Sequence, residues 1–343
     1  MANRSRTRAL VPLALALGLF GWAAWPWLPF SRGAAPPRTI VFYGFSILAE
    51  VFNDAIFPAF EARWREEHGE EVEILGSFAG SGTITNQVIL GVPADLVLVS
   101  LELDALRLAE AGVIAAKSWR ALPHRGVVNR TPFVILVRPG NPKRIAGFED
   151  LAREGVGVVH PDPLTSGGAN WAIIAEYGAG LREHPDQPDA GFELLRGVWK
   201  NVIAQAASAR AARTQFENGF GDALVTYEQE ALWDRARGKL EADVVYPRRT
   251  VLSEHTLVVV DRNVDPAEKP IVEAFARFLW SDEAQRLFVR YGFRSVVEER
   301  NGDNPAFGHV EDPFTIEAVG GWERAKRQIV DGVWKARVLP ELK

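Results

Sequence analysis

From Thr39 onward, short apolar runs alternate with longer segments in which apolar residues recur at helical spacing. Short apolar runs predict buried strands, whereas a recurrence every three to four residues predicts an amphipathic helix. The clearest helical stripe contains Val51, Phe52, Ala55, Phe60 and Trp64. The expected strands are 39–43, 72–75, 95–99, 132–138 and 156–160. The expected helices are 48–67, 83–90, 101–111, 148–153 and one that includes 171–175.

This alternation of strands and helices predicts an α/β fold with a mostly parallel sheet covered by helices. In open sheets of this kind, ligands bind at the carboxyl ends of the strands. A chain of 343 residues is longer than one compact core usually takes, so two lobes are expected. No repeat of about 20–50 residues is visible, which argues against solenoids and propellers.

Two loops rich in glycine and serine lie between an expected strand and an expected helix. The first is Ser77-Phe-Ala-Gly-Ser-Gly82, and the second is Thr165-Ser-Gly-Gly-Ala-Asn-Trp171. A helix that begins in such a loop presents free backbone N–H groups and the positive end of its dipole. Because Gly167 and Gly168 have no side chain, an anion can approach these amides directly. One such loop is usually a simple chain reversal or helix cap, but two of them indicate an oxyanion held between two lobes.

Several other kinds of chemistry are not visible in the sequence. Neither loop has the Gly-Lys-Ser/Thr of a Walker A motif or the spacing of a dinucleotide-binding loop. With no cysteine in the chain, disulfides, thiolate metal sites and thiol nucleophiles are excluded. The 6 histidines are scattered, and none has a second ligand one helical turn away, so no metal and no cofactor are expected. No Gly-x-Ser-x-Gly nucleophile elbow is present.

Residues 1–35 are expected to be a targeting segment. Arg4, Arg6 and Arg8 precede a nearly apolar run over 9–28. This run has about the length of ~20 residues that crosses a bilayer, and a proline follows the small residues at which cleavage would occur. A cleaved signal peptide and an uncleaved membrane anchor therefore both stay open. In either case the basic residues stay inside, and the rest of the chain is exported.

The exported part of the chain is acidic. The targeting segment takes four arginines and no acidic residue from a chain of formal charge −5, which leaves −9. A nucleic-acid-binding protein usually shows a basic surplus or stripe, and neither is visible, so no nucleic-acid partner is expected. A small anion would have to be bound by local dipoles rather than by net charge.

Read with their flanks, the two loops resemble the sulfate/thiosulfate-binding proteins of bacterial ABC importers. The resemblance continues, in order and at similar spacing, through 91–97, 133–143, 160–171, 219–231 and 314–322. It implies the two-lobed fold of type II periplasmic binding proteins, with mixed sheets, covering helices, and a hinge and a ligand cleft between the lobes. Lobe one would hold 38–134 and 254–343, and lobe two would hold 135–253.

The resemblance implies capture of a tetrahedral oxyanion, with sulfate or thiosulfate first, and its delivery to the permease subunits of an ABC transporter. It also implies a periplasmic monomer without catalytic activity. A membrane-anchored oxyanion sensor of the same fold, and a binder of phosphate or molybdate, stay open as alternatives. An exported hydrolase is a further rival, which would need His160 within hydrogen-bond reach of Ser166.

Carried over by position, the resemblance implies a site made of backbone amides and hydroxyl groups. The ligand-binding residues would be Gly44, Ser81, Ser166, Gly167, Gly168, Ala209 and Tyr227. Ser46 and Arg210 would have supporting roles, and Arg210 would hold the turn at Ala209 without touching the anion.

The chain departs from the family pattern in two places. The family's first loop carries Tyr-Asp-Pro-Thr-Arg, whereas this chain has Tyr43-Gly-Phe-Ser-Ile47, without the aspartate and the arginine. Tyr227 stands where the family has a tryptophan, whose indole N–H can only donate a hydrogen bond. A tyrosine hydroxyl donates and accepts, so it would also admit an oxyanion that carries a proton. The alternative for Tyr227 is aromatic packing below the cleft.

Overall fold

The computed structural model describes residues 37–342. From Thr39 onward the chain forms one compact unit, which contains the α/β fold. The expected targeting segment, 1–35, lies outside the described residues. Within residues 37–342, no helix combines the length and the apolar character that crossing a membrane requires.

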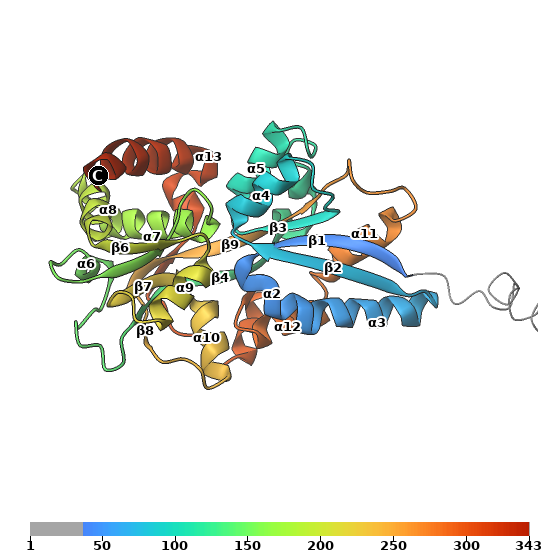
Figure 1. The fold of residues 1–343 in the computed structure, drawn as a ribbon, viewed down its shortest axis with the longest axis horizontal. Coiled ribbons are helices and arrows are strands. Elements are labelled where there is room, and N and C mark those ends of the chain that lie inside the picture. Colours follow the sequence, from blue (N-terminus) through green and yellow to red (C-terminus); the bar gives the residue numbers. More distant parts are fainter. Residues whose placement is uncertain (1–36, 343) are drawn as a thin grey trace, which may run out of the picture. The chain divides into compact units, whose positions relative to one another are not determined.

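A single hydrogen-bonded path of strands runs through the fold in the order β2-β1-β3-β9-β4-β7-β5-β6 (Figure 1). Three short strands lie off this path, of which β8 and β10 pair with β4, and β11 pairs with β9. The bounds are β1 (Arg38–Phe45), β2 (Val72–Ala79), β3 (Leu96–Val99), β4 (Val127–Val137), β5 (Val158–Pro161), β6 (Val202–Ala206), β7 (Ala223–Tyr227), β8 (Asp243–Val245), β9 (Arg249–Val259), β10 (Arg294–Ser295) and β11 (Asp312–Phe314).

The sheet is mixed, so the mostly parallel sheet expected from the alternation is wrong in its central part. The pairs β1–β3, β5–β6 and β5–β7 are parallel, as expected. However, β9 is antiparallel to β3 and β4, and β4 is antiparallel to β7. The two long strands β4 and β9 connect the group β2-β1-β3 to the group β7-β5-β6. The predicted lobe boundaries, 134–135 and 253–254, fall within these two strands.

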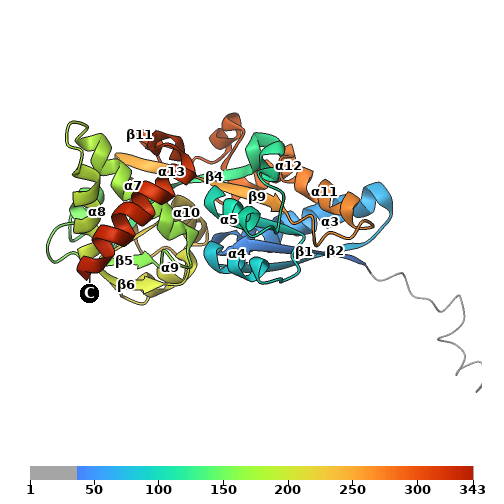
Figure 2. The ribbon, with the colours of Figure 1, turned by 90° about the horizontal axis from the view of Figure 1, so that it is seen from above.

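Helices cover both strand groups (Figures 1 and 2). The helices are α2 (Ala49–Val51), α3 (Phe57–His68), α4 (Ser81–Ile89), α5 (Glu102–Glu110), α6 (Phe148–Leu151), α7 (Gly167–Glu183), α8 (Ala190–Lys200), α9 (Ala209–Glu217), α10 (Glu228–Ala236), α11 (Lys269–Phe278), α12 (Asp282–Arg290) and α13 (Gly321–Ala325). After α13, a π-helical segment, Lys326–Val338, packs on α7 and α8. The C-terminal segment therefore rests on helices of the stretch predicted as lobe two.

The expected helix 48–67 is present, but it is not a continuous α-helix. A 3₁₀ turn, Ser46–Leu48, leads into α2, a π-helical stretch Phe52–Ile56 and then α3. Pro58, in the first turn of α3, has no backbone N–H to donate to the preceding turn, which explains the wider helix before it.

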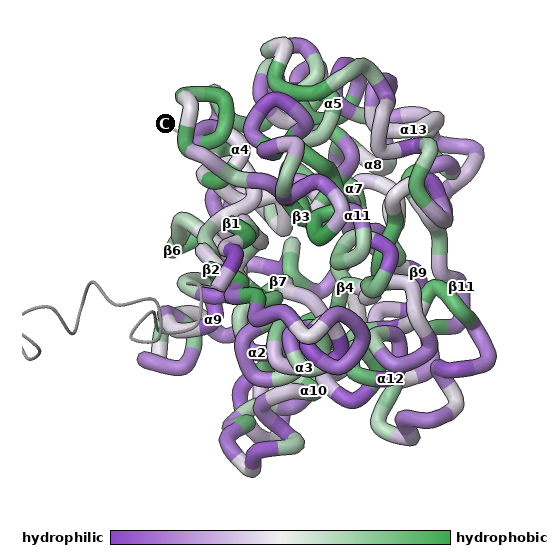
Figure 3. The backbone as a smooth tube through the Cα atoms, turned by 90° about the vertical axis from the view of Figure 1, so that its right-hand side faces the viewer, coloured by the Kyte–Doolittle hydropathy of each residue, from purple (hydrophilic) through white to green (hydrophobic). Residues whose placement is uncertain are grey.

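The core is built from apolar side chains of the strands and of the helix faces that cover them. Figure 3 colours the backbone by the hydropathy of each residue, with hydrophobic residues in green. Phenylalanine rings dominate it beside β1: the ring of Phe42 stacks on Phe52 at 4.5 Å and meets Phe57 edge-on at 5.5 Å. This packing fixes β1, at whose end the first loop begins.

Candidate anion-binding site

Three helices begin close to one another and leave four backbone N–H groups without partners. Ser81 begins α4, Gly167 and Gly168 begin α7, and Ala209 begins α9. First-turn amides have no carbonyl partner within their own helix. In the part of the chain that the structure describes, no other group accepts a hydrogen bond from these four amides. Each helix also directs the positive end of its dipole toward this point.

The loop before α4 touches the loops before α7 and α9. The amides of Gly82 and Thr83 donate to the carbonyl oxygen of Thr165, at 3.0 and 3.3 Å. A Cβ atom on Gly80 would lie 2.4 Å from that oxygen and 2.6 Å from the carbonyl oxygen of Ala207. Backbone therefore meets backbone here, and only glycine permits this approach at position 80.

Two buried hydroxyl groups lie against the first turn of α7. A Cβ atom on Gly167 would lie 2.1 Å from Ser100 Oγ, and one on Gly168 would lie 3.0 Å from Tyr227 Oη. Ser100 and Tyr227 are both 0% exposed, and neither oxygen has a hydrogen-bond partner among residues 37–342. A buried hydroxyl without a partner is costly, which makes this pair a sign of a polar ligand.

The hydroxyl of Ser81 is already used within the protein. It donates to Asp104 Oδ2 at 2.6 Å and accepts from the amide of Ser100 at 2.9 Å. Burial raises the pKa of Asp104, and the hydrogen bond from Ser81 and the charge of Arg107 counteract that rise. In this arrangement Ser81 offers its backbone amide, rather than its hydroxyl hydrogen, to an anion.

The residues before α7 and α9 leave the helix amides open in two different ways. Ser166 is 3% exposed and has extended backbone angles, φ −111° and ψ 120°, but its side chain does not cap α7. A capping hydroxyl would normally accept from the first turn and compete with a ligand. Ser208 does cap α9, but it accepts from the amide of Ala211 at 3.1 Å and leaves that of Ala209 free.

The first loop lies beside Tyr227. Gly44 is at the end of β1, where a Cβ atom would lie 2.7 Å from the ring of Phe78. The ring centroids of Phe45 and Tyr227 are 6.1 Å apart. The turn that begins at Ser46 packs against α9.

Arg210 ties α9 to α2 and α10 by ion pairs. Its Nη2 lies 2.8 Å from Glu50 Oε2, and its Nε lies 3.0 Å from Glu230 Oε1. Burial lowers the pKa of Arg210, but the carboxylates of Glu230 and Glu50 outweigh it and raise the pKa well above its usual range. The guanidinium is therefore charged and shared between two carboxylates.

His160 faces the protein interior. Its Nδ1 lies 2.8 Å from the carbonyl oxygen of Pro161, and its Nε2 lies 3.3 Å from Glu176 Oε1. Within the described residues it makes no hydrogen bond to Ser166, so the geometry that a hydrolase requires is not found there. No group of three or more His, Cys, Asp or Glu side chains in residues 37–342 is arranged to hold a metal ion.

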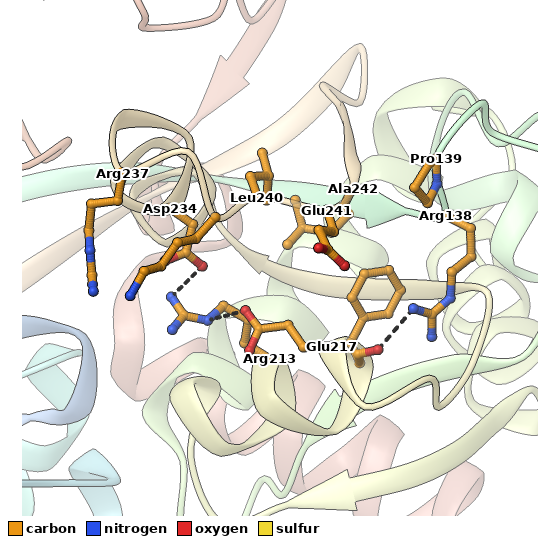
Figure 4. Close-up of a pocket in the computed structure, with 12 residues that line it drawn as sticks. Arg138, Pro139, Arg213, Glu217, Asp234, Arg237, Leu240, Glu241 and Ala242 are labelled. Carbon is orange, nitrogen blue, oxygen red and sulfur yellow. Dashed lines mark hydrogen bonds and ion pairs between the residues drawn. The ribbon is translucent and has the colours of Figure 1, made fainter.

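One surface cavity, of about 550 Å³, lies away from these helix N-termini between α9, α10 and the end of β4 (Figure 4). Several of its charged side chains have partners. Arg213 lies 3.1 Å from Glu217 and 3.0 Å from Asp234, and Arg138 donates to the carbonyl oxygen of Phe216 at 2.9 Å. None of the predicted ligand-binding residues lines this cavity.

A family described as "Bacterial extracellular solute-binding protein" matches residues 47–294. The chain belongs to this family. A sulfate-binding protein of Escherichia coli is 35% identical over 276 residues, which are 79% of this chain and 83% of that protein. A thiosulfate-binding protein of Pseudomonas aeruginosa is 33% identical over 341 residues, 96% and 97% of the two chains.

Among solved structures, the sulfate-binding protein SubI of Mycobacterium tuberculosis matches this solute-binding protein with a TM-score of 0.77 and 31% identity. The match covers 85% of this chain and 99% of that one. The predicted resemblance and the predicted two-lobed α/β fold of periplasmic binding proteins are thereby confirmed.

In this solute-binding protein, sequence reasoning missed Ser100 and Asp104. Ser100 directly follows β3, and the carboxyl end of a strand is where such folds bind ligands, so its position was a usable signal. Asp104 carried no such signal, because it lies within α5 and reaches the site only through Ser81.

Proposed function

We propose that this chain is an extracytoplasmic solute-binding protein that captures a tetrahedral oxyanion, with sulfate or thiosulfate first, and delivers it to an ABC permease. The proposal rests on one observation. Three helix N-termini lie close together, and they present the unpartnered amides of Ser81, Gly167, Gly168 and Ala209. The names of the sulfate-binding and thiosulfate-binding relatives support the choice of anion.

The anion is bound by uncharged hydrogen-bond donors. An unpaired dianion inside a protein would be prohibitively unfavourable. Short hydrogen bonds from amides and hydroxyls to a charged group can replace its water shell, and each helix dipole adds about 0.3–1 kcal/mol. Arg210 is already shared between two carboxylates, so it holds the first turn of α9 in place instead of binding the anion.

Binding favours a closed form, because the donors come from both lobes. Lobe one, 38–134 and 254–343, supplies Gly44 and Ser81, and lobe two, 135–253, supplies the rest. A ligand that contacts both lobes stabilises the state in which they meet. The hydrogen bonds from Gly82 and Thr83 to Thr165 support such a state. The hinge lies in β4 and β9, and the C-terminal segment after α13 crosses onto lobe two.

The protein acts as a carrier and not as an enzyme. It works in the periplasm as a monomer, and residues 1–35 direct its export. The extracellular solute-binding family and the relatives named as binding proteins support this assignment. The interior position of His160 supports it too, since its ring contacts Pro161 and Glu176 and makes no hydrogen bond to Ser166 within residues 37–342.

Calorimetric titration of the purified protein with sulfate, thiosulfate, molybdate and phosphate tests the proposal. We expect saturable binding of one sulfate or thiosulfate per chain, and no binding of nitrate, a planar oxyanion that cannot reach amides arranged around a tetrahedron. If none of the four tetrahedral anions binds saturably, the proposed function is wrong.

A further inference from the structure

Ser100 holds its hydroxyl group at a fixed place beside the start of α7. Its amide donates to Ser81 Oγ at 2.9 Å, and its carbonyl oxygen accepts from the indole of Trp171 at 2.6 Å. The backbone of Ser100 is therefore anchored both to α4 and to α7. Its Oγ is the one polar atom of this residue that has no partner among residues 37–342, and it lies against Gly167.

Tyr227 is held just as firmly. Its ring centroid lies 4.6 Å from that of Phe133 and 5.7 Å from that of His255. Burial raises the pKa of Tyr227 far above its usual range, so the hydroxyl is neutral at physiological pH, and the nearby Ser100 hydroxyl opposes that rise. The two hydroxyls are neighbours, but their geometry does not make a hydrogen bond between them.

The carboxylates near this pair are occupied by other groups. Asp104 accepts from Ser81 at 2.6 Å and from Arg107 at 2.9 Å. Glu230 is paired with Arg210 at 2.9 Å and with Arg213 at 3.1 Å. The helix amides can only donate. The hydroxyl oxygens of Ser100 and Tyr227, which are buried and unpartnered among residues 37–342, are therefore available as acceptors for a proton on the ligand.

We propose that Ser100 Oγ and Tyr227 Oη together contact the bound oxyanion and let the site take tetrahedral oxyanions with or without one proton. This inference rests on the proposed function. A hydroxyl group has one hydrogen to donate and lone pairs that accept. When both hydroxyls donate to the ligand, the pair suits sulfate. When Tyr227 donates to the ligand, a lone pair of Ser100 Oγ accepts the proton of a hydrogen phosphate ion.

Thr226 provides a matched control. It precedes Tyr227 in β7, is 1% exposed, and its Oγ1 is also buried without a partner in the described part of the chain. Side chains alternate between the two faces of a strand, so Thr226 points away from the face that Tyr227 occupies. A Thr226→Val variant therefore removes an unpartnered buried hydroxyl outside the proposed pair.

The test is calorimetry with sulfate and with inorganic phosphate in mildly alkaline buffer, where phosphate carries one proton. The proteins are the wild type, Ser100→Ala, Tyr227→Phe, the double variant and Thr226→Val. We expect the wild type to bind both anions. Each single variant is expected to lose about tenfold or more in affinity for phosphate. The loss for sulfate should be smaller in Ser100→Ala, because only the proton of phosphate is left without its acceptor. The double variant should lose less than the product of the single losses, because the two hydroxyls act as one unit.

Four results would overturn the inference. If the wild type binds sulfate but not phosphate, or if both single variants bind both anions as the wild type does, the hydroxyl pair is wrong and the proposed function stands. If the wild type binds neither sulfate nor any other tetrahedral oxyanion, both are wrong. Thr226→Val is expected to bind both anions as the wild type does. If Thr226→Val loses as much phosphate affinity as Ser100→Ala, the hydroxyl pair has no specific role. Circular dichroism establishes that each variant is folded.

Discussion

At the scale of single residues, three glycines are required by distance rather than by backbone angles. Gly80, Gly167 and Gly168 do not have the positive φ angles that favour glycine, but a Cβ atom on any of them would lie 3.0 Å or less from an atom of another element. Because these glycines have no side chain, the loops can approach one another closely, and an anion can reach the backbone amides.

His255 makes stability depend on pH. It is fully buried in β9, with Nδ1 2.5 Å from Asn129 Oδ1. Burial lowers the pKa of His255 to about 3, whereas a histidine in the unfolded chain has a pKa of about 6.5. Between these values the unfolded chain binds more protons. This contribution to stability is therefore complete above about pH 6.5 and is lost as the pH falls toward 3.

We expect His255→Gln to flatten the acid side of the stability profile. The fall in the free energy of unfolding between about pH 6.5 and pH 4 should shrink by an amount on the order of a few kcal/mol. Urea unfolding at a series of pH values measures it. His309→Gln changes an exposed histidine and should keep the wild-type slope. An unchanged slope in His255→Gln would contradict the assignment.

Part of the candidate site could be predicted from single residues. Small residues before a helix indicate an anion site locally, which is how Gly167 and Gly168 were found. For Ser100 the one usable signal was its position directly after β3, and its importance depends on which loop faces the end of that strand. For the same reason, the sequence does not reveal that the Ser81 hydroxyl donates to Asp104, 23 residues away.

At the scale of elements, the ion pair between Arg210 and Glu50 joins α9 of one strand group to α2 of the other. The side chains are 23% and 21% exposed, so water screens the pair only in part. Arg210 keeps Glu230 as a partner if Glu50 is changed. The pair therefore contributes to the closed arrangement without being the sole support of the guanidinium.

We expect Glu50→Gln to weaken sulfate binding by about three- to tenfold, because the start of α9 is then held less firmly against α2. Calorimetry measures the affinity. Glu67→Gln is the control, since the pair of Arg63 and Glu67, at 2.8 Å, is exposed at both ends and far from the helix N-termini. Equal affinities of the Glu50 and Glu67 variants would show that the ion pair does not support binding.

Most elements could be predicted, but their limits could not. β2 continues to Ala79, so the loop expected from Ser77 is largely strand, and α7 begins at Gly167, before the expected run at Trp171. β2 pairs with β1, and the strand includes the stretch from Ser77 to Ala79 although the pattern of that stretch is not strand-like. Such pairing is decided by the tertiary structure and not by local preference.

At the scale of the whole molecule, the strands β4 and β9 connect the two α/β groups into one continuous hydrogen-bonded path of strands. Alternation of strands and helices predicts each group, but not the antiparallel strand between them. β9 follows more than 100 residues after β4 begins, so its direction depends on how the chain returns. The resemblance to periplasmic binding proteins supplied the mixed sheet and the two lobes that periodicity alone did not.

Ligand binding should stabilise the whole molecule. At a sulfate concentration of about 100 times Kd, binding to the folded state alone adds about 2.7 kcal/mol to the free energy of unfolding. For a chain of this size that corresponds to a rise in Tm of about 4 °C. Differential scanning calorimetry measures the rise, with sodium chloride at equal ionic strength as the control. A Tm that is the same in both salts would contradict specific binding.

A sulfate titration of Gly168→Asp tests the anion site most directly. The new side chain would place a negative charge and bulk at the first turn of α7, within 3.0 Å of Tyr227. Gly302→Asp adds the same charge where nothing lies within 4 Å. We predict that Gly168→Asp stays folded and loses saturable sulfate binding, whereas Gly302→Asp binds as the wild type does. Wild-type sulfate affinity in a folded Gly168→Asp protein would contradict the binding of an anion at these helix N-termini.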